Sequence, residues 1–224
     1  GDYDAGKTPA SNNTVTSVTI PYDVLEVQKY AFYNCTALET VNFLSNDKNE
    51  SCKFIREYAF SKATSLKNIN LENVGMIGNN AFEDCTSLNN VDLRGAYAIG
   101  RRAFYNCTSL EYVDITALRN AGVETFMNCT SLKTIDNGRY TNFSVRMFRN
   151  SGLTTLTYFA DRIPDNCFEN CKDLTNVEIV NNLVYVGAKA FNNCGKLEKV
   201  VFSENAGSEY NNKKAFNNCT ALEE

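Results

Sequence analysis

The sequence of 224 residues has an ordinary globular composition, with 43% hydrophobic, 21% charged and 12% aromatic residues. Its 22 basic and 26 acidic residues give a net charge of −4, which argues against a nucleic-acid or anionic-membrane surface, because such a surface needs a basic excess. Histidine is absent, which excludes histidine triads, histidine zinc sites and histidine general bases, and no apolar run reaches the ~18 residues of a membrane span.

The chain begins with a polar stretch, GDYDAGKTPASN, and we expect residues 1–12 to be disordered or to form a linker stub. It opens with Gly1 and shows no signal peptide, so we expect that any targeting segment has been removed. A first strand is expected over residues 15–20, closed by Pro21. From there to residue 224 the sequence predicts one repeat domain, which we place at residues 13–224.

A phrase such as AFYNCTSLEYVDI recurs along this domain, and one phenylalanine marks each copy: Phe32, Phe60, Phe82, Phe104, Phe126, Phe148, Phe168, Phe191 and Phe216. The phenylalanines are 20 to 28 residues apart, with 22 the commonest spacing. A cysteine stands three positions later in seven copies, and a leucine follows in every copy. In the three most regular units we expect the core to contain Phe82, Cys85, Leu88, Phe104, Cys107, Leu110, Phe126, Cys129 and Leu132.

Each unit has two halves with different periodicities. In IGRRAFYNC the apolar residues fall on one face of a short helix, and in LEYVDI they alternate as in a strand. Gly78, Gly100 and Gly187 precede such turns, and we expect them to permit a tight entry. A single unit is too small to bury its own apolar face, so stacked units must bury it against each other. We therefore predict an α/β repeat fold, a right-handed solenoid with about nine parallel strands in one sheet and short helices or 3₁₀ turns on the other side.

Two segments depart from the period. Residues 44–54 and 203–214 lengthen their units and are polar, so we expect surface loops there. The last repeat is truncated after Leu222, and because solenoids normally end in polar caps, we expect the natural protein to continue beyond residue 224 and its last visible unit to be less ordered.

The unit I-G-x-x-A-F-x-N-C-x-x-L-x-x-V-x-L resembles the BspA-like class of leucine-rich repeats, over roughly residues 15–224. The copies at Phe60 and Phe148 depart from it, because they lack the cysteine. The resemblance implies a bacterial, secreted or cell-surface solenoid that binds other macromolecules, often in adhesion. It supplies no catalytic residues and no specific partner.

Nine cysteines are present, and seven share one repeat position, which favours a row of buried thiols over disulfides or a metal site. NCT recurs at Asn34, Asn106, Asn128 and Asn218 and matches a glycosylation acceptor. Its fixed place in the repeat favours a structural role in a tight turn. We predict no metal and no cofactor.

The outward positions of the strands carry the functional signal. One row contains Asp92, Asp114 and Asp136, and a neighbouring row contains Tyr112 and Thr134. Stacked like charges cost stability, so the aspartates indicate a cation, a basic partner or simple solvation. Tyr112 and its hydrogen-bonding neighbours suit contact with a protein or glycan. We therefore predict a binding face on Asp92, Tyr112, Asp114, Thr134 and Asp136.

The leading hypothesis is a non-enzymatic binding module that engages an extracellular protein or glycan through this face. We expect it to act as a monomer, without nucleic acid and without inserting into a membrane. The alternative is a structural spacer that presents another domain. A carboxylate-based enzyme would need two acids about 5–10 Å apart in a cleft, which a repeat surface does not offer.

Overall fold

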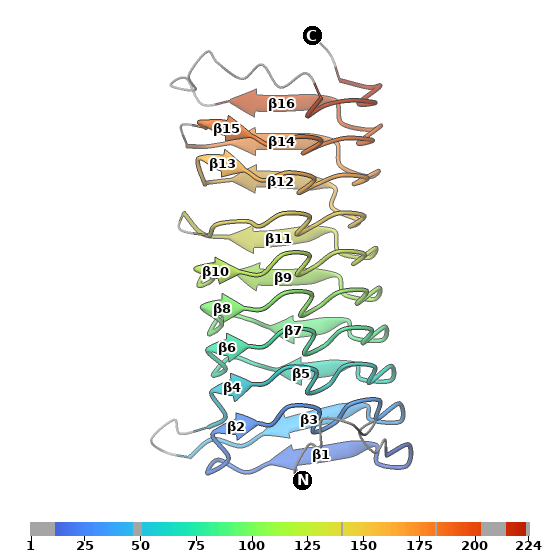
Figure 1. Cartoon of the computed structure of the whole chain (residues 1–224), viewed down its shortest axis with the longest axis vertical. Coiled ribbons are helices and arrows are strands. Elements are labelled where there is room, and N and C mark those ends of the chain that lie inside the picture. Colours follow the sequence, from blue (N-terminus) through green and yellow to red (C-terminus); the bar gives the residue numbers. More distant parts are fainter. Residues whose placement is uncertain (1–11, 47–50, 140, 182, 203–213, 223–224) are drawn as a thin grey trace.

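The structure is a computed structural model and describes residues 12–46, 51–139, 141–181, 183–202 and 214–222. Over these residues the chain winds into a parallel β-solenoid, whose turns are stacked along the long axis in Figure 1. The expected segment 1–12 lies outside the described residues except for Asn12, and most of residues 203–214 do as well.

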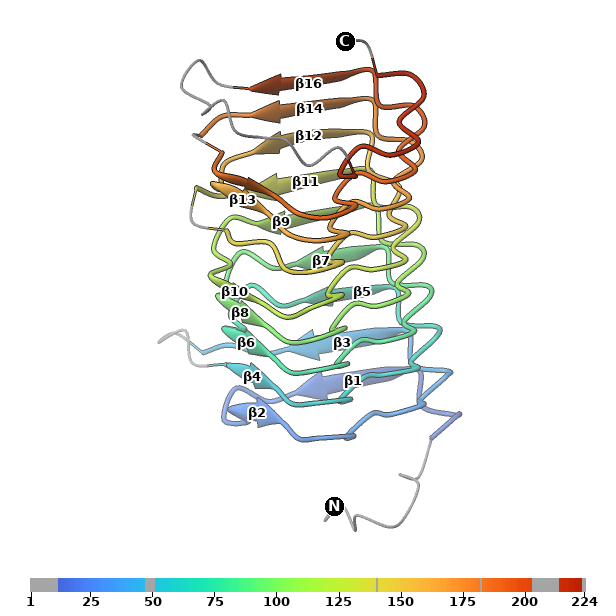
Figure 2. The ribbon, with the colours of Figure 1, turned by 45° about the horizontal axis from the view of Figure 1, so that its top comes forward.

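Strands occupy two faces of the solenoid. Among the described residues, those on the broad face are β1 (Ser17–Ile20), β3 (Thr40–Phe43), β5 (Asn68–Asn70), β7 (Asn90–Asp92), β9 (Tyr112–Ile115), β11 (Thr134–Asn137), β12 (Thr155–Tyr158), β14 (Asn176–Ile179) and β16 (Lys199–Phe202). Two-residue strands on a second face are β2 (Glu26–Val27), β4 (Phe54–Ile55), β6 (Met76–Ile77), β8 (Ala98–Ile99), β10 (Asn120–Ala121), β13 (Arg162–Ile163) and β15 (Tyr185–Val186). Figure 2 shows both faces, joined through about eight turns of chain.

Equivalent residues of successive turns pair in parallel register, as in Thr40 with Asn68 and Asn68 with Asn90. The expected single continuous sheet is not formed on the broad face by the described residues. Hydrogen bonding divides it into β1-β3-β5-β7, β9-β11 and β12-β14-β16. Between β7 and β9 the bond from the Glu111 amide to the Asn89 carbonyl is stretched to 3.5 Å.

The second interruption follows from an irregular unit. Between β11 and β12 the side-chain amide of Asn137 donates to the carbonyl of Thr157 at 2.8 Å, so that a side chain bridges the two strands there. Phe143 fills the adjoining core, with its ring centroid 5.0 Å from that of Phe148 and 4.8 Å from that of Tyr158. The irregular unit thus keeps the stack closed without a continuous ladder.

The predicted short helices or 3₁₀ turns are wrong for the described residues, since the Phe-Cys segments form successive β-turns. The amides of Ala103, Tyr105 and Cys107 bond to carbonyls three residues back within their own turn. The alternate amides of Arg102, Phe104 and Asn106 instead donate to carbonyls of the next unit, at 2.9–3.0 Å. In an α-helix the backbone amides bond to carbonyl groups of the same segment. Because half of the amides here donate to a neighbouring unit, the Phe-Cys segment cannot be helical.

Two positions in each turn adopt a left-handed backbone. Arg102 (φ 53°) and Asn106 (φ 60°) show the pattern, and in the described residues every residue with positive φ is other than glycine. Asparagine tolerates this region better than most residues. The asparagines of the NCT phrases stand at one of these positions, where Asn218 donates to Asn193 and Asn106 to Asp84.

The expected role of the glycines is therefore corrected. None of the described glycines has positive φ, so conformational freedom does not explain them. A Cβ on Gly122 would stand 2.2 Å from the backbone nitrogen of Arg101 in the preceding unit. Glycine is needed here because adjacent turns approach too closely for any side chain.

Phenylalanine forms the central column of the core. Successive rings from Phe32 to Phe216 stack with centroids 5.1–5.8 Å apart and planes within 11° of parallel. The rings from Phe60 to Phe191 are fully buried, and the Cys and Leu positions of the three regular units are fully buried beside them. Burial of this column in every turn supplies the main driving force for stacking.

The seven cysteines that share one repeat position form a second column. All nine cysteines are free; eight are buried, and Cys219 is partly exposed. The thiol of Cys107 donates to the carbonyl of Phe82 and that of Cys129 to the carbonyl of Phe104, each at 3.2 Å. Cys85, Cys171, Cys194 and Cys219 repeat this bond in their own units. Burial raises the pKa of Cys129 and of Cys171 to about 12.

We expect Gly122→Ala to lower the free energy of unfolding by roughly 2–3 kcal/mol, because the new methyl group collides with the backbone of the neighbouring turn. Gly195→Ala is the matched control: its Cβ would meet nothing nearer than 3.8 Å, so it should change stability by less than ~0.5 kcal/mol. Urea unfolding followed by circular dichroism measures both. Equal losses in the two variants would contradict the close-packing explanation.

We expect the buried thiols to resist modification in the folded state, because deprotonation, which creates the nucleophile, is disfavoured by burial. Titration with a thiol reagent at pH 8 under non-reducing conditions should detect Cys219 first, with most of the nine appearing only after addition of denaturant. Detection of one thiol or none in denaturant would show disulfides and contradict the column.

Candidate functional site

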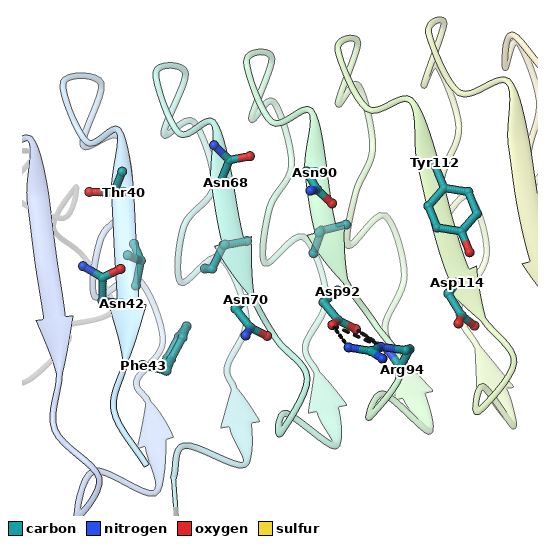
Figure 3. Close-up of a pocket in the computed structure, with 13 residues that line it drawn as sticks. Thr40, Asn42, Phe43, Asn68, Asn70, Asn90, Asp92, Arg94, Tyr112 and Asp114 are labelled. Carbon is teal, nitrogen blue, oxygen red and sulfur yellow. Dashed lines mark hydrogen bonds and ion pairs between the residues drawn. The ribbon is translucent and has the colours of Figure 1, made fainter.

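Two rows of outward side chains run across the broad face, because alternate residues of each strand point away from the core. The first row contains Thr40, Asn68, Asn90, Tyr112, Thr134, Thr155, Asn176 and Lys199. The second row contains Asn42, Asn70, Asp92, Asp114, Asp136, Thr157, Glu178 and Val201. Figure 3 shows part of both rows, with a strip of open face between them.

A groove of about 800 Å³ occupies the broad face from β3 to β9. Its polar lining comes from both rows and from the strand ends: Thr40, Asn42, Asn68, Asn70, Asn90, Asp92, Arg94, Tyr112 and Asp114. Phe43 also borders it, from the inward side of β3, where its ring is partly buried against the core. A smaller depression of about 390 Å³ is lined by Asn68, Asn89, Asn90, Glu111 and Tyr112. The groove therefore combines amides, carboxylates and hydroxyls with two aromatic rings.

The second row has a structural task at the ends of β5, β7 and β9. The side-chain oxygen of Asn70 accepts a hydrogen bond from the amide of Glu72 at 2.9 Å. Asp92 accepts in the same way from Arg94 at 3.1 Å, and Asp114 from Thr116 at 3.0 Å. These Asx turns close the strands. Asparagine and aspartate serve equally in them, so the aspartate row by itself is not evidence of a ligand.

Asp92 is neutralised within the groove. Arg94 binds it through two nitrogens, with Nε 3.0 Å and Nη2 2.6 Å from its carboxylate oxygens. This bidentate pair holds the pKa of Asp92 below its ordinary value, chiefly through the hydrogen bonds from Arg94. Arg94 also lies 4.0 Å from Glu72. The pair gives this part of the groove a strongly polar surface on which the two charges balance each other.

Asp136 has a different partner. The amide two residues after Asp136, that of Gly138, donates to the hydroxyl of Thr141 and not to the aspartate. The carboxylate of Asp136 can therefore bond to a side chain of the neighbouring turn. Its Oδ2 accepts the hydroxyl of Tyr112 at 2.5 Å. That bond raises the pKa of Tyr112 to about 12, with smaller contributions from desolvation and from the nearby aspartates. Tyr112 is thus held neutral with its ring fixed on the face, 41% exposed.

The structure places the predicted site residues as follows. Asp92, Tyr112 and Asp114 line the groove, and Asp136 adjoins it through its bond to Tyr112. Thr134 is exposed and pairs in register with Tyr112, but it lies outside the groove lining. The groove also extends towards the N-terminus as far as Thr40, further than predicted. Arg94 and Phe43 were not singled out; the position of Arg94 two residues after Asp92, inside an Asx turn, could have indicated it.

Within the described residues, no cluster of three or more His, Cys, Asp or Glu side chains is arranged to hold a metal ion. No helix in the described ranges is long and apolar enough to cross a membrane.

Solved structures of similar fold are leucine-rich repeat proteins of bacteria. A leucine-rich cell surface protein of Faecalibacterium prausnitzii shares 22% identity over 100% of this chain and 84% of its own, with a TM-score of 0.51. A leucine-rich repeat protein of T. pallidum shares 22% identity over 82% of this chain and 78% of its own, with a TM-score of 0.58. The pneumococcal vaccine antigen PcpA shares 19% identity over 85% of this chain and 62% of its own, with a TM-score of 0.52. No curated protein matches the sequence.

These likenesses define the class as a leucine-rich repeat solenoid. The sequence narrows it further, because the profile of the BspA type leucine rich repeat region matches residues 10–117, 53–161 and 157–224, in six copies. The chain belongs to this family, as the repeated Ala-Phe-x-Asn-Cys phrase predicted.

We expect Tyr112 to titrate with a pKa of about 12, visible as the difference between the ultraviolet pH titrations of the native protein and of Tyr112→Phe. Asp136→Asn should return this pKa towards ~10, because the negative charge is lost. The folded value lies above the unfolded one, so the stabilisation from this pair is present below pH ~10 and is lost as the pH rises from 10 to 12. An unchanged pKa in Asp136→Asn would contradict the assigned bond.

Proposed function

We propose that the protein is a non-enzymatic binding module that acts outside the cell and holds an extracellular macromolecule in the groove across β3, β5, β7 and β9. The observation that carries the proposal is the groove itself, which has a volume of about 800 Å³, is lined by side chains of both rows and has an immobilised tyrosine at one end. Three of the residues predicted from sequence, Asp92, Tyr112 and Asp114, line it. The location outside the cell is supported by the family and by one solved structure of similar fold that is named as a cell surface protein.

The chemistry of the face supports binding over catalysis. Leucine-rich repeat solenoids of this family are typically non-enzymatic. The two groove aspartates, Asp92 and Asp114, both hold strand-end turns, and Asp92 is also paired with Arg94. A general acid needs a carboxyl group poised to exchange a proton near neutral pH, whereas the pKa of Asp92 is lowered.

The alternative is a spacer that holds another domain away from a surface. The fully buried phenylalanine column, continuous from Phe60 to Phe191, favours this reading because it makes a stiff rod. The two functions differ in one respect: a spacer needs no particular residue in the groove.

The test compares two triple variants of equal design. The groove variant carries Asn68→Ala, Asn90→Ala and Tyr112→Ala; the control variant carries Thr155→Ala, Asn176→Ala and Lys199→Ala. Both change exposed residues of the first row, on different strands. The immobilised proteins are offered extracellular matrix proteins, mucin and purified polysaccharides. We expect a ligand that the native protein and the control variant retain and that the groove variant loses at least tenfold, since hydrogen bonds and aromatic burial are removed.

Folding of the variants is checked by circular dichroism and by urea unfolding. Equal retention of every ligand by both variants would place the binding site elsewhere. A native protein that retains nothing from the panel would contradict the binding module and leave the spacer.

A further inference from the structure

The groove is built on a repeat along the solenoid axis, with β3, β5 and β7 paired in register and β9 following them. Asn68 pairs in register with Asn90, and both belong to the first row; Asn70 pairs with Asp92 in the second row. Each row therefore presents one polar side chain per turn, at the strand spacing of ~4.8 Å. A ligand that lies along the axis between the rows meets the same pair of positions in every turn (Figure 3).

This period discriminates between extended ligands. An extended peptide presents equivalent groups on one side every two residues, or ~6.6 Å, so it drifts out of register with the rows after a single turn. A helix laid in a groove is held by apolar side chains, but Tyr112 is the only large aromatic side chain among the outward-facing residues of the described lining. In a β-linked pyranose chain successive rings are turned over, but each ring carries hydroxyl groups on both edges. Every ring can therefore meet both rows, at nearly the spacing of the strands.

The hydrogen-bonding groups of the groove fit hydroxyl groups. Asn68 and Asn90 each offer an amide donor and a carbonyl acceptor, and both are exposed. A sugar hydroxyl also donates and accepts, so one amide satisfies it in either direction. Opposite them the second row supplies Asn42, Asn70 and Asp92. Each pyranose unit would thus meet polar groups on two sides.

The exposed ring of Tyr112 fits the face of a sugar ring. Tyr112 lies at one end of the groove in Figure 3. Tyr112 is 41% exposed, yet its hydroxyl is anchored to Asp136, so little side-chain freedom is lost when a ring stacks on it. An aromatic platform beside hydrogen-bonding groups is the usual composition of a small-molecule site.

Charge selects among glycans. Arg94 is the only basic side chain that the described groove lining contains, and it is paired with Asp92. Asp114 lines the groove and Asp136 adjoins it, with Thr116 and Tyr112 as their neutral hydrogen-bonding partners. An acidic polysaccharide would meet repulsion from these carboxylates without a compensating cation. A neutral chain meets none.

We propose that the groove binds an extended, neutral, β-linked glycan of about four pyranose units, one for each of the strands β3, β5, β7 and β9, with a terminal ring stacked on Tyr112. This inference rests on the proposed function, and it names the ligand class of the same groove.

The test is calorimetric titration with four soluble β-linked hexasaccharides: cellohexaose, xylohexaose and mannohexaose, which are neutral, and the hexamer of mannuronic acid, which is the acidic counterpart of mannohexaose. A hexapeptide of alternating serine and threonine serves as the extended peptide. We expect at least one neutral hexasaccharide to bind, and the acidic hexamer and the peptide to bind at least tenfold more weakly. The groove variant should lose at least tenfold in affinity for the neutral chain, whereas the control variant should keep it.

Single substitutions separate the contributions. Tyr112→Phe keeps the ring and should retain most of the affinity, whereas Tyr112→Ala should lose roughly tenfold, as expected when an aromatic contact is removed. Asn90→Ala should weaken binding, and Asn176→Ala, its counterpart outside the groove, should not. Binding by Tyr112→Ala at native strength would overturn the stacking assignment.

The two proposals fail in different ways. If none of the neutral hexasaccharides binds, while the groove variant still loses a protein that the native chain retains, the glycan inference is wrong and the binding module stands. Stronger binding of the peptide or of the acidic hexamer than of every neutral chain would also overturn the glycan inference. Neutral-chain binding that is equal in the groove and control variants would overturn both, because the groove would then be irrelevant.

Discussion

The structure depends on how each turn uses its backbone amides. Along the Phe-Cys segment, alternate amides close β-turns within their own unit and the others donate to carbonyls of the next unit, as Arg102, Phe104 and Asn106 do. This division makes a unit incomplete by itself, because half of its turn donors are satisfied only when another unit is stacked on it. It also requires left-handed backbone at two positions per turn and backbone contact too close for a side chain at Gly122. The stacked rings and the buried thiols then fill the interior that this backbone geometry leaves.

Much of this arrangement could be predicted from the sequence, because the core column has one residue type per turn. The spacing of Phe, Cys and Leu indicated the units, the parallel strands, the family and the buried residues. The turns were misjudged since a run such as Ala103-Phe104-Tyr105 has apolar spacing compatible with a helix, and periodicity cannot show that alternate amides bond to another unit. The breaks in the sheet were missed for a similar reason. Asn137 and Phe143 act through contacts with the following turn, and no local pattern marks those contacts.

The candidate site was predictable in its face and only partly in its residues. Strand alternation correctly placed Asp92, Tyr112 and Asp114 on the outside, where they line one groove. The aspartates were predicted to be functional because they form a row of like charges. Their side chains accept hydrogen bonds from the amides two residues ahead, which explains why this position favours Asp and Asn in consecutive turns. What the sequence could not show is where the face is hollowed, since that depends on the way the stacked turns follow one another. Nor could it show that the hydroxyl of Tyr112 reaches across to Asp136.

These assignments leave few positions on the described part of the solenoid that the fold does not already occupy. On the turn side, side-chain hydrogen bonds such as that from Asn150 to Asn128, and ion pairs such as that of Arg102 with Glu124, join successive units. Most of the second row near the groove closes strands. The first row is different: Asn68 and Asn90 are exposed and carry amide groups that the strand itself does not require. These amides are held on rigid strands and repeat at the spacing of the turns, and the row ends at an anchored aromatic ring. The surface is therefore ordered before any ligand binds. Binding there would cost little conformational entropy, which favours a weakly interacting, repetitive chain over a compact partner.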